Sequence, residues 1–365
     1  FMQLQGIDYL VFAEREEFDM REVKMIQYGV GAMGSLMVKT ALKRKGLRLV
    51  GAIDQGKRVG MDLGEAIGLD GKLGISISGD PQNLLRNTDA DVILHATVSF
   101  LDQVYPQIIM GVEAGMNFIS ITEELGYPWY RYPDLANKID RLSRERGVTV
   151  LGTGINPGFT LDTLVLHCTG LCDEVKRITA RRISDSSPFG PNVLDRRGIG
   201  LSLEQWEKKV SENKITGHIG SDQSMRMIAA GLGWNLDETV EMPIEPIITE
   251  VTIKLPYAKI EKGTVCGYNQ KQYALMREEK VILFENEGRV YGEDEEHHTE
   301  ESVHIEGNPE IKLAMPGLSG GISTASMAVN AIPQVMVSRP GLVSMKDLPN
   351  PAALIDIGRF FHYCN

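Results

Sequence analysis

The hydrophobic and polar positions of the first 157 residues are arranged in blocks that are typical of a parallel α/β sheet. Short apolar runs of the kind buried on both faces predict strands; they span residues 23–28, 48–53, 74–78, 91–97, 117–122 and 148–154. Segments rich in helix formers predict helices at 35–45, 101–114 and 132–146, each followed by a glycine. We therefore predict an α/β fold of the Rossmann type, with about six strands in a doubly wound parallel sheet.

The pattern changes after Pro157. A strand-like segment at 175–186 is followed by helical segments near 202–213 and 224–231. Alternating runs between residues 246 and 315 have hairpin-like spacing and predict a mostly antiparallel sheet in a second, α+β domain. The predicted organisation is an N-terminal extension (1–24), a dinucleotide-binding domain (25–157), a substrate domain (158–316) and a helical C-terminal segment (317–365) that packs back on the first domain.

A glycine-rich turn joins the first predicted strand to the first predicted helix. Gly29, Gly31 and Gly34 have the spacing G-x-G-x-x-G, which allows a tight turn, close approach of a pyrophosphate and close packing of helix on strand. We expect this turn, including Ala32 and Met33, to hold the phosphates of a dinucleotide at the start of the helix. The alternative is a glycine turn selected for packing alone.

The second predicted strand ends in Asp54, about 20 residues after the third glycine, where a carboxylate accepts from the ribose 2′-hydroxyl of NAD. Lys57 and Arg58 follow and would instead hold the 2′-phosphate of NADP. A carboxylate–hydroxyl bond generally outweighs exposed cation contacts. We therefore expect NAD or NADP as cofactor, with NAD slightly preferred.

The composition narrows the classes of function. With 38 Lys and Arg against 49 Asp and Glu, the formal net charge is −11, which argues against nucleic acid or an anionic membrane as partner. No apolar run is long enough to span a bilayer, and the first 20 residues lack a signal-peptide pattern. The cysteines lack metal-site spacing and are expected to be inert buried thiols in a reducing cytoplasm: Cys168, Cys172, Cys266 and Cys364.

Several polar residues fall where the predicted strands end, which is where ligands bind in such sheets. Glu123 and Glu124 follow the strand at 117–122. Either is placed to accept a proton from an amine or a water during hydride transfer, and the alternative is that both cap a helix. Thr97 ends another strand and is expected to contact the cofactor.

Two further segments carry candidate ligand contacts. In "GTGINPGF", Asn156 offers its amide to a bound cofactor or substrate, while Pro157 and Gly158 form a hinge between the domains. In "GHIGSDQSM", His218 lies between glycines, and both a local hydrogen bond and a substrate contact are open to it. His297 and His298 lie in a polar run that predicts a solvated loop, so no metal site is expected.

Together with "SPFGP", "GLGW" and "GGISTASMAVNAIPQV", these segments resemble the 2,4-diaminopentanoate dehydrogenase family, over about residues 25–349. That family belongs to the dihydrodipicolinate-reductase-like oxidoreductases and is related to amine dehydrogenases that act on simple ketones. The resemblance implies NAD(P)-dependent oxidative deamination of 2,4-diaminopentanoate to 2-amino-4-oxopentanoate and ammonia, in ornithine degradation. It also implies that an acid of "TEE" is the catalytic carboxylate.

The implied diamine substrate carries a carboxylate, which needs a cationic or N–H partner. Arginines flank "SPFGP" at 181, 182, 196 and 197, and Arg182 is assigned to the substrate together with Asn156 and His218. Three alternatives stay open: an amine dehydrogenase for simple ketones, a dihydrodipicolinate-reductase-like enzyme, and a nucleotide-sensing protein without turnover. We expect a homodimer.

Overall fold

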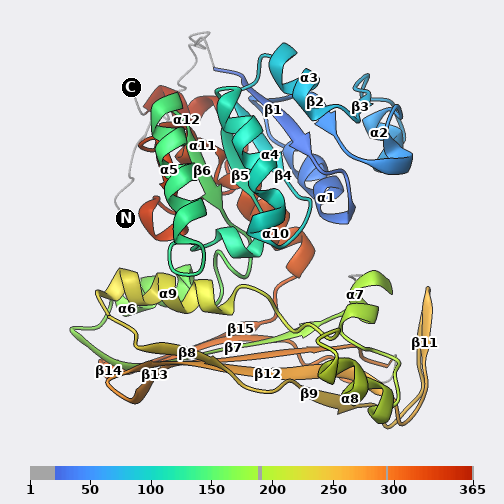
Figure 1. The fold of residues 1–365 in the computed structure, drawn as a ribbon, viewed down its shortest axis with the longest axis vertical. Helices are drawn as coiled ribbons and strands as arrows, with labels where there is room; N and C mark the ends of the chain where they lie inside the picture. Colours follow the sequence, from blue (N-terminus) through green and yellow to red (C-terminus); the bar gives the residue numbers. More distant parts are fainter. Residues whose placement is uncertain (1–20, 188–190, 293–294, 364–365) are drawn as a thin grey trace, which may run out of the picture.

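The computed structural model describes residues 21–187, 191–292 and 295–363, which form two layers, one above the other in Figure 1. The upper layer is a sheet enclosed by helices. The lower layer is a broad sheet of long strands, with helices α6 (Thr163–Thr169) and α9 (Ser221–Leu232) between it and the upper layer.

The first sheet confirms the predicted parallel, doubly wound architecture. Its strand order is β16-β6-β5-β4-β1-β2-β3, and every pair is parallel. The strands are β1 (Val23–Tyr28), β2 (Leu47–Ile53), β3 (Ile77–Ser78), β4 (Val92–His95), β5 (Asn117–Ser120), β6 (Thr149–Gly152) and β16 (Gly341–Val343). The sequence did not predict β16, because three apolar residues are too short a run to identify a strand.

Helices cover both faces of this sheet. The first face packs against α1 (Ala32–Ala41), α10 (Gly320–Asn330) and α11 (Ile332–Val337). The second packs against α3 (Pro81–Asn87), α4 (Leu101–Glu113) and α5 (Pro133–Arg146). Helix α1 begins and ends earlier than the predicted 35–45, because Gly31 is already its N-cap and residues 43–46 form a turn into β2. Short segments complete this half: η1 (Gly56–Arg58), α2 (Leu63–Ala66), η2 (Glu123–Leu125), η4 (Met345–Asp347) and α12 (Gly358–Tyr363).

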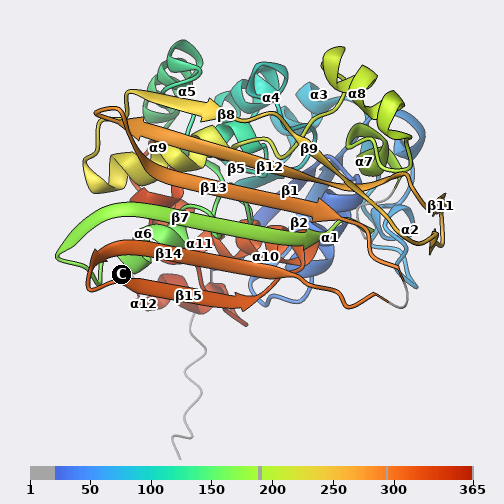
Figure 2. The same ribbon diagram turned by 90° about the horizontal axis from the view of Figure 1, so that it is seen from below.

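The second sheet is mostly antiparallel, as predicted, with order β15-β14-β7-β13-β12-β8 and with β9 also paired to β12. The pair β13–β7 is parallel. The strands are β7 (Glu174–Asp185), β8 (Glu238–Glu241), β9 (Glu245–Ile248), β12 (Val265–Met276), β13 (Glu279–Arg289), β14 (Glu300–Asn308) and β15 (Ile311–Pro316). Figure 2 looks onto the face of this sheet that lies away from α6 and α9. A small hairpin, β10 (Ile253–Leu255) and β11 (Ala258–Ile260), and helices α7 (Pro191–Arg196) and α8 (Leu203–Ser211) lie at one end.

The C-terminal segment returns to the first layer: α10 packs along α1, and β16 extends the sheet beside β6. The expectation of buried cysteines needs correction, because Cys168 and Cys172 are only half-buried near the end of α6, whereas Cys266 is buried. Cys364 and the first 20 residues lie outside the described residues. In the part of the chain that the structure describes, no helix combines the length and apolar character that crossing a membrane requires.

Candidate active site

A cavity of about 530 Å³ lies at the carboxyl ends of the first sheet's strands, where they face the second domain. The first domain lines it with residues of the glycine turn, the loop after β4, η2 and the loop after β6. The second domain lines it with Arg182 and Ser184 of β7, with α7 and with the segment around His218. The cavity therefore brings together most of the segments that the sequence predicted to converge there.

The three glycines of the turn have different reasons to be glycine. A Cβ at Gly29 would lie 2.3 Å from the carbonyl oxygen of Ala96, and one at Gly34 would lie 1.9 Å from that of Gly29. Gly29 also has φ +88°, a conformation that favours glycine. A Cβ at Gly31, in contrast, would meet no atom within 4 Å, and Gly31 lines the cavity. Packing therefore explains Gly29 and Gly34, but the space beside Gly31 is free for a ligand.

The start of α1 suits the phosphates of a dinucleotide. Gly31, Ala32 and Met33 line the cavity at the helix N-terminus. No side chain caps these first N–H groups, and the first turn has no acidic residue, so donors and positive helix-end potential face the cavity. The residues present thus fit a dinucleotide at the predicted turn.

Asp54 and Arg58 lie next to the turn rather than in the cavity wall. The Asp54 carboxylate accepts hydrogen bonds from the Val30 N–H (3.2 Å) and the Gln55 N–H (2.7 Å). Arg58 donates from Nη1 to the Val30 carbonyl oxygen at 2.7 Å, and the same nitrogen lies 3.7 Å from Asp54 Oδ2. Both side chains keep part of their surface exposed, so both are placed to meet the ribose of a cofactor held by the turn.

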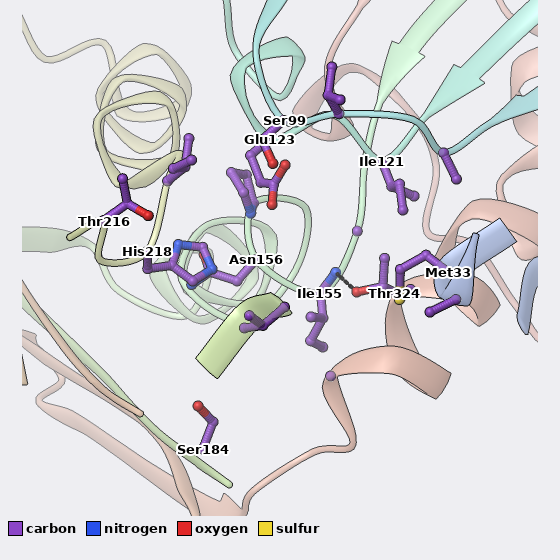
Figure 3. A pocket seen from close by; sticks show the side chains of 18 of the residues that line it. Met33, Ser99, Ile121, Glu123, Ile155, Asn156, Ser184, Thr216, His218 and Thr324 are labelled. Atoms are coloured by element: carbon purple, nitrogen blue, oxygen red, sulfur yellow. Dashed lines mark hydrogen bonds between the residues drawn. The ribbon is translucent and has the colours of Figure 1, made fainter. Parts of the chain in front are cut away.

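Glu123 lines the cavity, and its carboxylate points into it (Figure 3). Burial raises the pKa of Glu123, while the Ser99 hydroxyl and the charge of Arg196 act in the opposite direction. A carboxyl whose pKa is raised in this way binds its proton more tightly than an ordinary glutamate and is suited to act in proton transfer.

Glu124 faces away from the cavity. It is 1% exposed, and its Oε2 accepts from the Leu101 N–H at 2.9 Å and the Tyr132 hydroxyl at 2.7 Å. Its Oε1 lies 3.5 Å from Nη1 of Arg131. Of the two neighbouring carboxylates, Glu123 is therefore the one that can reach a ligand. Thr97 also lines the cavity, with its hydroxyl bonded to His95 and Gln107 beneath the wall.

Asn156 and His218 lie next to each other at one end of the cavity (Figure 3). Asn156 donates from Nδ2 to Asn286 at 3.4 Å, and its Oδ1 is buried without a hydrogen-bond partner among the described residues. The same is true of His218 Nδ1. Burial, with the charges of Arg182 and Arg197, lowers the pKa of His218 to about 3. His218 is therefore neutral near pH 7, and both residues offer atoms that a ligand can bond.

The arginines around "SPFGP" separate into three that line the cavity (Arg182, Arg196 and Arg197) and one, Arg181, that does not. Arg182 is 5% exposed, and its Nη1 lies 3.1 Å from Oε1 of Glu301 on the neighbouring strand β14. Burial lowers the pKa of Arg182 and raises that of Glu301 to about 7 against the attraction between them. Arg181 points elsewhere on the sheet, toward Glu285 and Glu287. Residues 188–190 of "SPFGP" lie outside the described residues.

The sequence analysis did not predict that α10 lines the cavity. Gly320 and Thr324 line the cavity, and the Thr324 hydroxyl accepts from the Ile155 N–H at 3.3 Å, which ties the helix to the loop after β6 (Figure 3). The glycine pair at the start of "GGIST" was the available signal. Among the described residues, no group of His, Cys, Asp or Glu is arranged to hold a metal ion.

Comparisons with known proteins show the family to which the chain belongs. Residues 159–362 match the 2,4-diaminopentanoate dehydrogenase C-terminal domain, and residues 23–119 match the N-terminus of dihydrodipicolinate reductase. The 2,4-diaminopentanoate dehydrogenase of Acetoanaerobium sticklandii is 40% identical over 92% of this chain and 96% of its own. The chain belongs to the 2,4-diaminopentanoate dehydrogenase family.

More distant relatives agree with this assignment. An amine dehydrogenase of Streptomyces virginiae is 24% identical over 92% of this chain and 99% of its own length. The structure of an amine dehydrogenase from Mycobacterium smegmatis superposes with a TM-score of 0.81 at 27% identity, covering 90% of this chain and 97% of that one. The family confirms the predicted class of enzyme: a nicotinamide-dependent oxidoreductase that acts on amines.

Proposed function

We propose that this enzyme oxidatively deaminates 2,4-diaminopentanoate to 2-amino-4-oxopentanoate and ammonia. The observation that carries the proposal is the position of Glu123: a carboxylate with a raised pKa faces a cavity that joins the glycine turn to a buried arginine. The 40% identity to the Acetoanaerobium sticklandii enzyme, whose name states this substrate, supports the same conclusion.

The cofactor is held by the first domain. The backbone at Gly31, Ala32 and Met33 binds the pyrophosphate, Asp54 and Arg58 meet the adenosine ribose, and Thr97 and Asn156 contact the cofactor farther along the cavity. When bound, the nicotinamide ring accepts a hydride from the substrate carbon that carries the amino group. NAD is preferred over NADP, because the Asp54 carboxylate bonds a 2′-hydroxyl and repels a 2′-phosphate.

Glu123 moves the protons of the reaction. In its ionised form the carboxylate accepts a proton from the water that adds to the imine carbon, and it returns that proton to the departing amine. Since burial raises the pKa of Glu123, the base form is present only above this raised value. We expect kcat/KM to rise with pH through it.

The second domain recognises the amino-acid end of the substrate. Arg182 binds the carboxylate, while Asn156 Oδ1 and the neutral ring of His218 accept from the ammonium group. If Arg196 at the exposed edge of the cavity binds the carboxylate instead, then Arg196→Met raises KM for the diamine more than Arg182→Met does. Steady-state kinetics of the two variants decide between them.

One assay tests the proposal. Reduction of NAD⁺ and of NADP⁺ is followed with 2,4-diaminopentanoate and with a panel of unfunctionalised amines. We expect kcat/KM to be highest for the diamine. A preference for simple amines would replace this function with that of a general amine dehydrogenase, the second candidate, which the resemblance to the Mycobacterium smegmatis fold favours.

The role of Glu123 is tested by Glu123→Gln, which keeps the shape of the side chain but cannot accept the proton. We expect kcat to fall by roughly 10²–10⁴-fold, the usual weight of general base catalysis, with dinucleotide affinity unchanged. Near-normal turnover would remove Glu123 from the mechanism.

A further inference from the structure

Glu124 joins separate elements beneath the cavity wall. Its buried carboxylate accepts from the N–H of Leu101, the first residue of α4, and from the hydroxyl of Tyr132, just before α5. The N-cap of α4, Phe100, has no side-chain hydrogen bond, so Glu124 supplies from another element the acceptor and the negative charge that a helix N-terminus favours.

Residues 97–100, which lie between β4 and α4, are tied to η2 by hydrogen bonds. The backbone N–H of Glu124 donates to the Ser99 carbonyl oxygen at 3.2 Å, while the Glu124 carboxylate binds the N–H two residues later. The Thr122 hydroxyl donates to the Val98 carbonyl oxygen at 2.8 Å. Glu124 therefore binds the backbone on the C-terminal side of the Ser99 side chain twice, at the Ser99 carbonyl oxygen and at the Leu101 N–H.

The Ser99 side chain in turn acts on Glu123, the carboxylate that faces the cavity, and lowers its pKa. Ser99 and Glu123 both line the cavity, and Figure 3 shows them side by side at its upper edge. A displacement of the 97–100 segment would therefore move the group that orients the catalytic carboxylate.

We propose that Glu124 is a positioning residue for Glu123: it fixes the 97–100 segment, and this segment presents the Ser99 hydroxyl to the catalytic carboxylate. The inference rests on the proposed role of Glu123 and assigns the second acid of "TEE" a separate task. It also explains why a carboxylate is buried at this place although it does not reach the cavity.

The charged groups that act on Glu123 give this role a kinetic signature. Arg196, at the end of α7, and the Ser99 hydroxyl favour the ionised form of Glu123, whereas the charge of Glu124 disfavours it. Nearby His218 is neutral. Displacement or loss of the Ser99 hydroxyl should therefore move the acid limb of the pH–kcat/KM profile to higher pH, whereas loss of the Glu124 charge alone should move it slightly lower.

The test compares Glu124→Ala, Glu124→Gln and Ser99→Ala in the full chain, with 2,4-diaminopentanoate and NAD⁺. We expect Glu124→Ala to lose roughly 10–100-fold in kcat, less than Glu123→Gln, with an acid limb shifted upward and the KM for NAD⁺ unchanged. Glu124→Gln keeps an acceptor for Leu101 and should recover most of the rate. Ser99→Ala should shift the acid limb upward by itself, and it serves as the decisive variant if Glu124→Ala does not fold. Arg131→Gln, which removes a half-exposed ion pair with Glu124 and a cation–π contact with Tyr132 but leaves the bond to Leu101 in place, is the matched control.

A lowered melting temperature in Glu124→Ala, with kcat and the acid limb unchanged, would overturn the proposal and leave Glu124 a structural residue. A downward shift in Glu124→Ala, or no shift in Ser99→Ala, would overturn it as well. If Glu123→Gln itself turns over normally, the proposed function of Glu123 fails first. The two failures are thus distinguishable.

Discussion

The two walls of the cavity are built in different ways. The wall from the first domain carries one charged residue, Glu123, among glycine, apolar and neutral polar residues of the glycine turn and of the loops after the strands. The wall from the second domain carries three arginines, and one of them, Arg182 of β7, is paired with Glu301 of β14 by strand register. The first wall suits a ligand that is the same for many enzymes, and the second suits a specific substrate.

This difference in charge affects how much each wall costs in stability. The wall from the first domain has one charge to desolvate, and at Gly31 its main requirement is that no Cβ fills the ligand space. The wall from the second domain buries a guanidinium that is paired with a carboxylate, which is costly unless both remain paired. Substitutions should therefore act on binding at the first wall and on both stability and binding at the second.

The largest effect is expected for Arg182→Met. This change leaves the Glu301 carboxylate, only 2% exposed, without its cation. Breaking a buried pair in this way typically costs about 3–5 kcal/mol of unfolding free energy. Urea denaturation at pH 8 measures the loss. Arg181→Met is the matched control on the adjacent position: Arg181 is 39% exposed and pairs at 3.6 Å, so its loss should cost at most about 1 kcal/mol.

The same variant has a pH dependence of known sign. The folded-state pKa of Glu301 is about 7, above the unfolded value near 4.3. The protonated carboxyl therefore favours the folded state, and this contribution is complete below about pH 4.3 and is lost as pH rises through 7. Removing Arg182 raises the pKa of Glu301 further. Arg182→Met should thus be destabilised least near pH 5 and most near pH 8, and an equal loss at both would show that the pair is not the cause.

The next comparison is between two glycines of the turn, of which Gly31 lines the cavity and Gly34 does not. Gly34→Ala places a Cβ 1.9 Å from the Gly29 carbonyl oxygen, so we expect a loss of about 1–3 kcal/mol or more in stability. Gly31→Ala meets no protein atom within 4 Å and should fold like the wild type. Its methyl group occupies the pyrophosphate space, so dinucleotide affinity should fall by roughly 10–150-fold, the equivalent of one charge-assisted bond. Calorimetric titration of Gly31→Ala with unchanged affinity would place the phosphates elsewhere.

The sequence predicted the wall of the first domain better than the wall of the second, because the first depends on local signals and the second on pairing between distant segments. The glycine spacing, the strand ends and the Glu123–Glu124 pair are local signals, since parallel strands bring their carboxyl ends to one edge without further information. Which acid of the pair faces the cavity was not among these signals. The pairing of Arg182 with Glu301 depends on the register between β7 and β14, which lie more than a hundred residues apart. Nor did local pattern indicate that α10 would bring Thr324 to the loop after β6. Strand β16 was missed because its partner β6, not its own three residues, makes it a strand.

The smallest expected effect concerns the choice between NAD and NADP, next to the glycine turn. Asp54 serves two purposes there, because it accepts from the N–H groups of Val30 and Gln55 and is also placed to meet the ribose. Asp54→Asn is therefore the sharper test, since asparagine keeps an acceptor for the turn while removing the charge.

We expect Asp54→Asn to raise the ratio of kcat/KM for NADP over NAD by about tenfold, because a partly exposed charge acting on a phosphate a few ångströms away contributes about 1–2 kcal/mol. Arg58 donates to the Val30 carbonyl oxygen and lies close enough to Asp54 to neutralise part of its field. Arg58→Ala should therefore weaken NADP more than NAD. A wild type that strongly prefers NADP, together with an unchanged preference in Arg58→Ala, would mean that other residues bind the ribose. The ribose site would then also depend on side chains that the fold brings together.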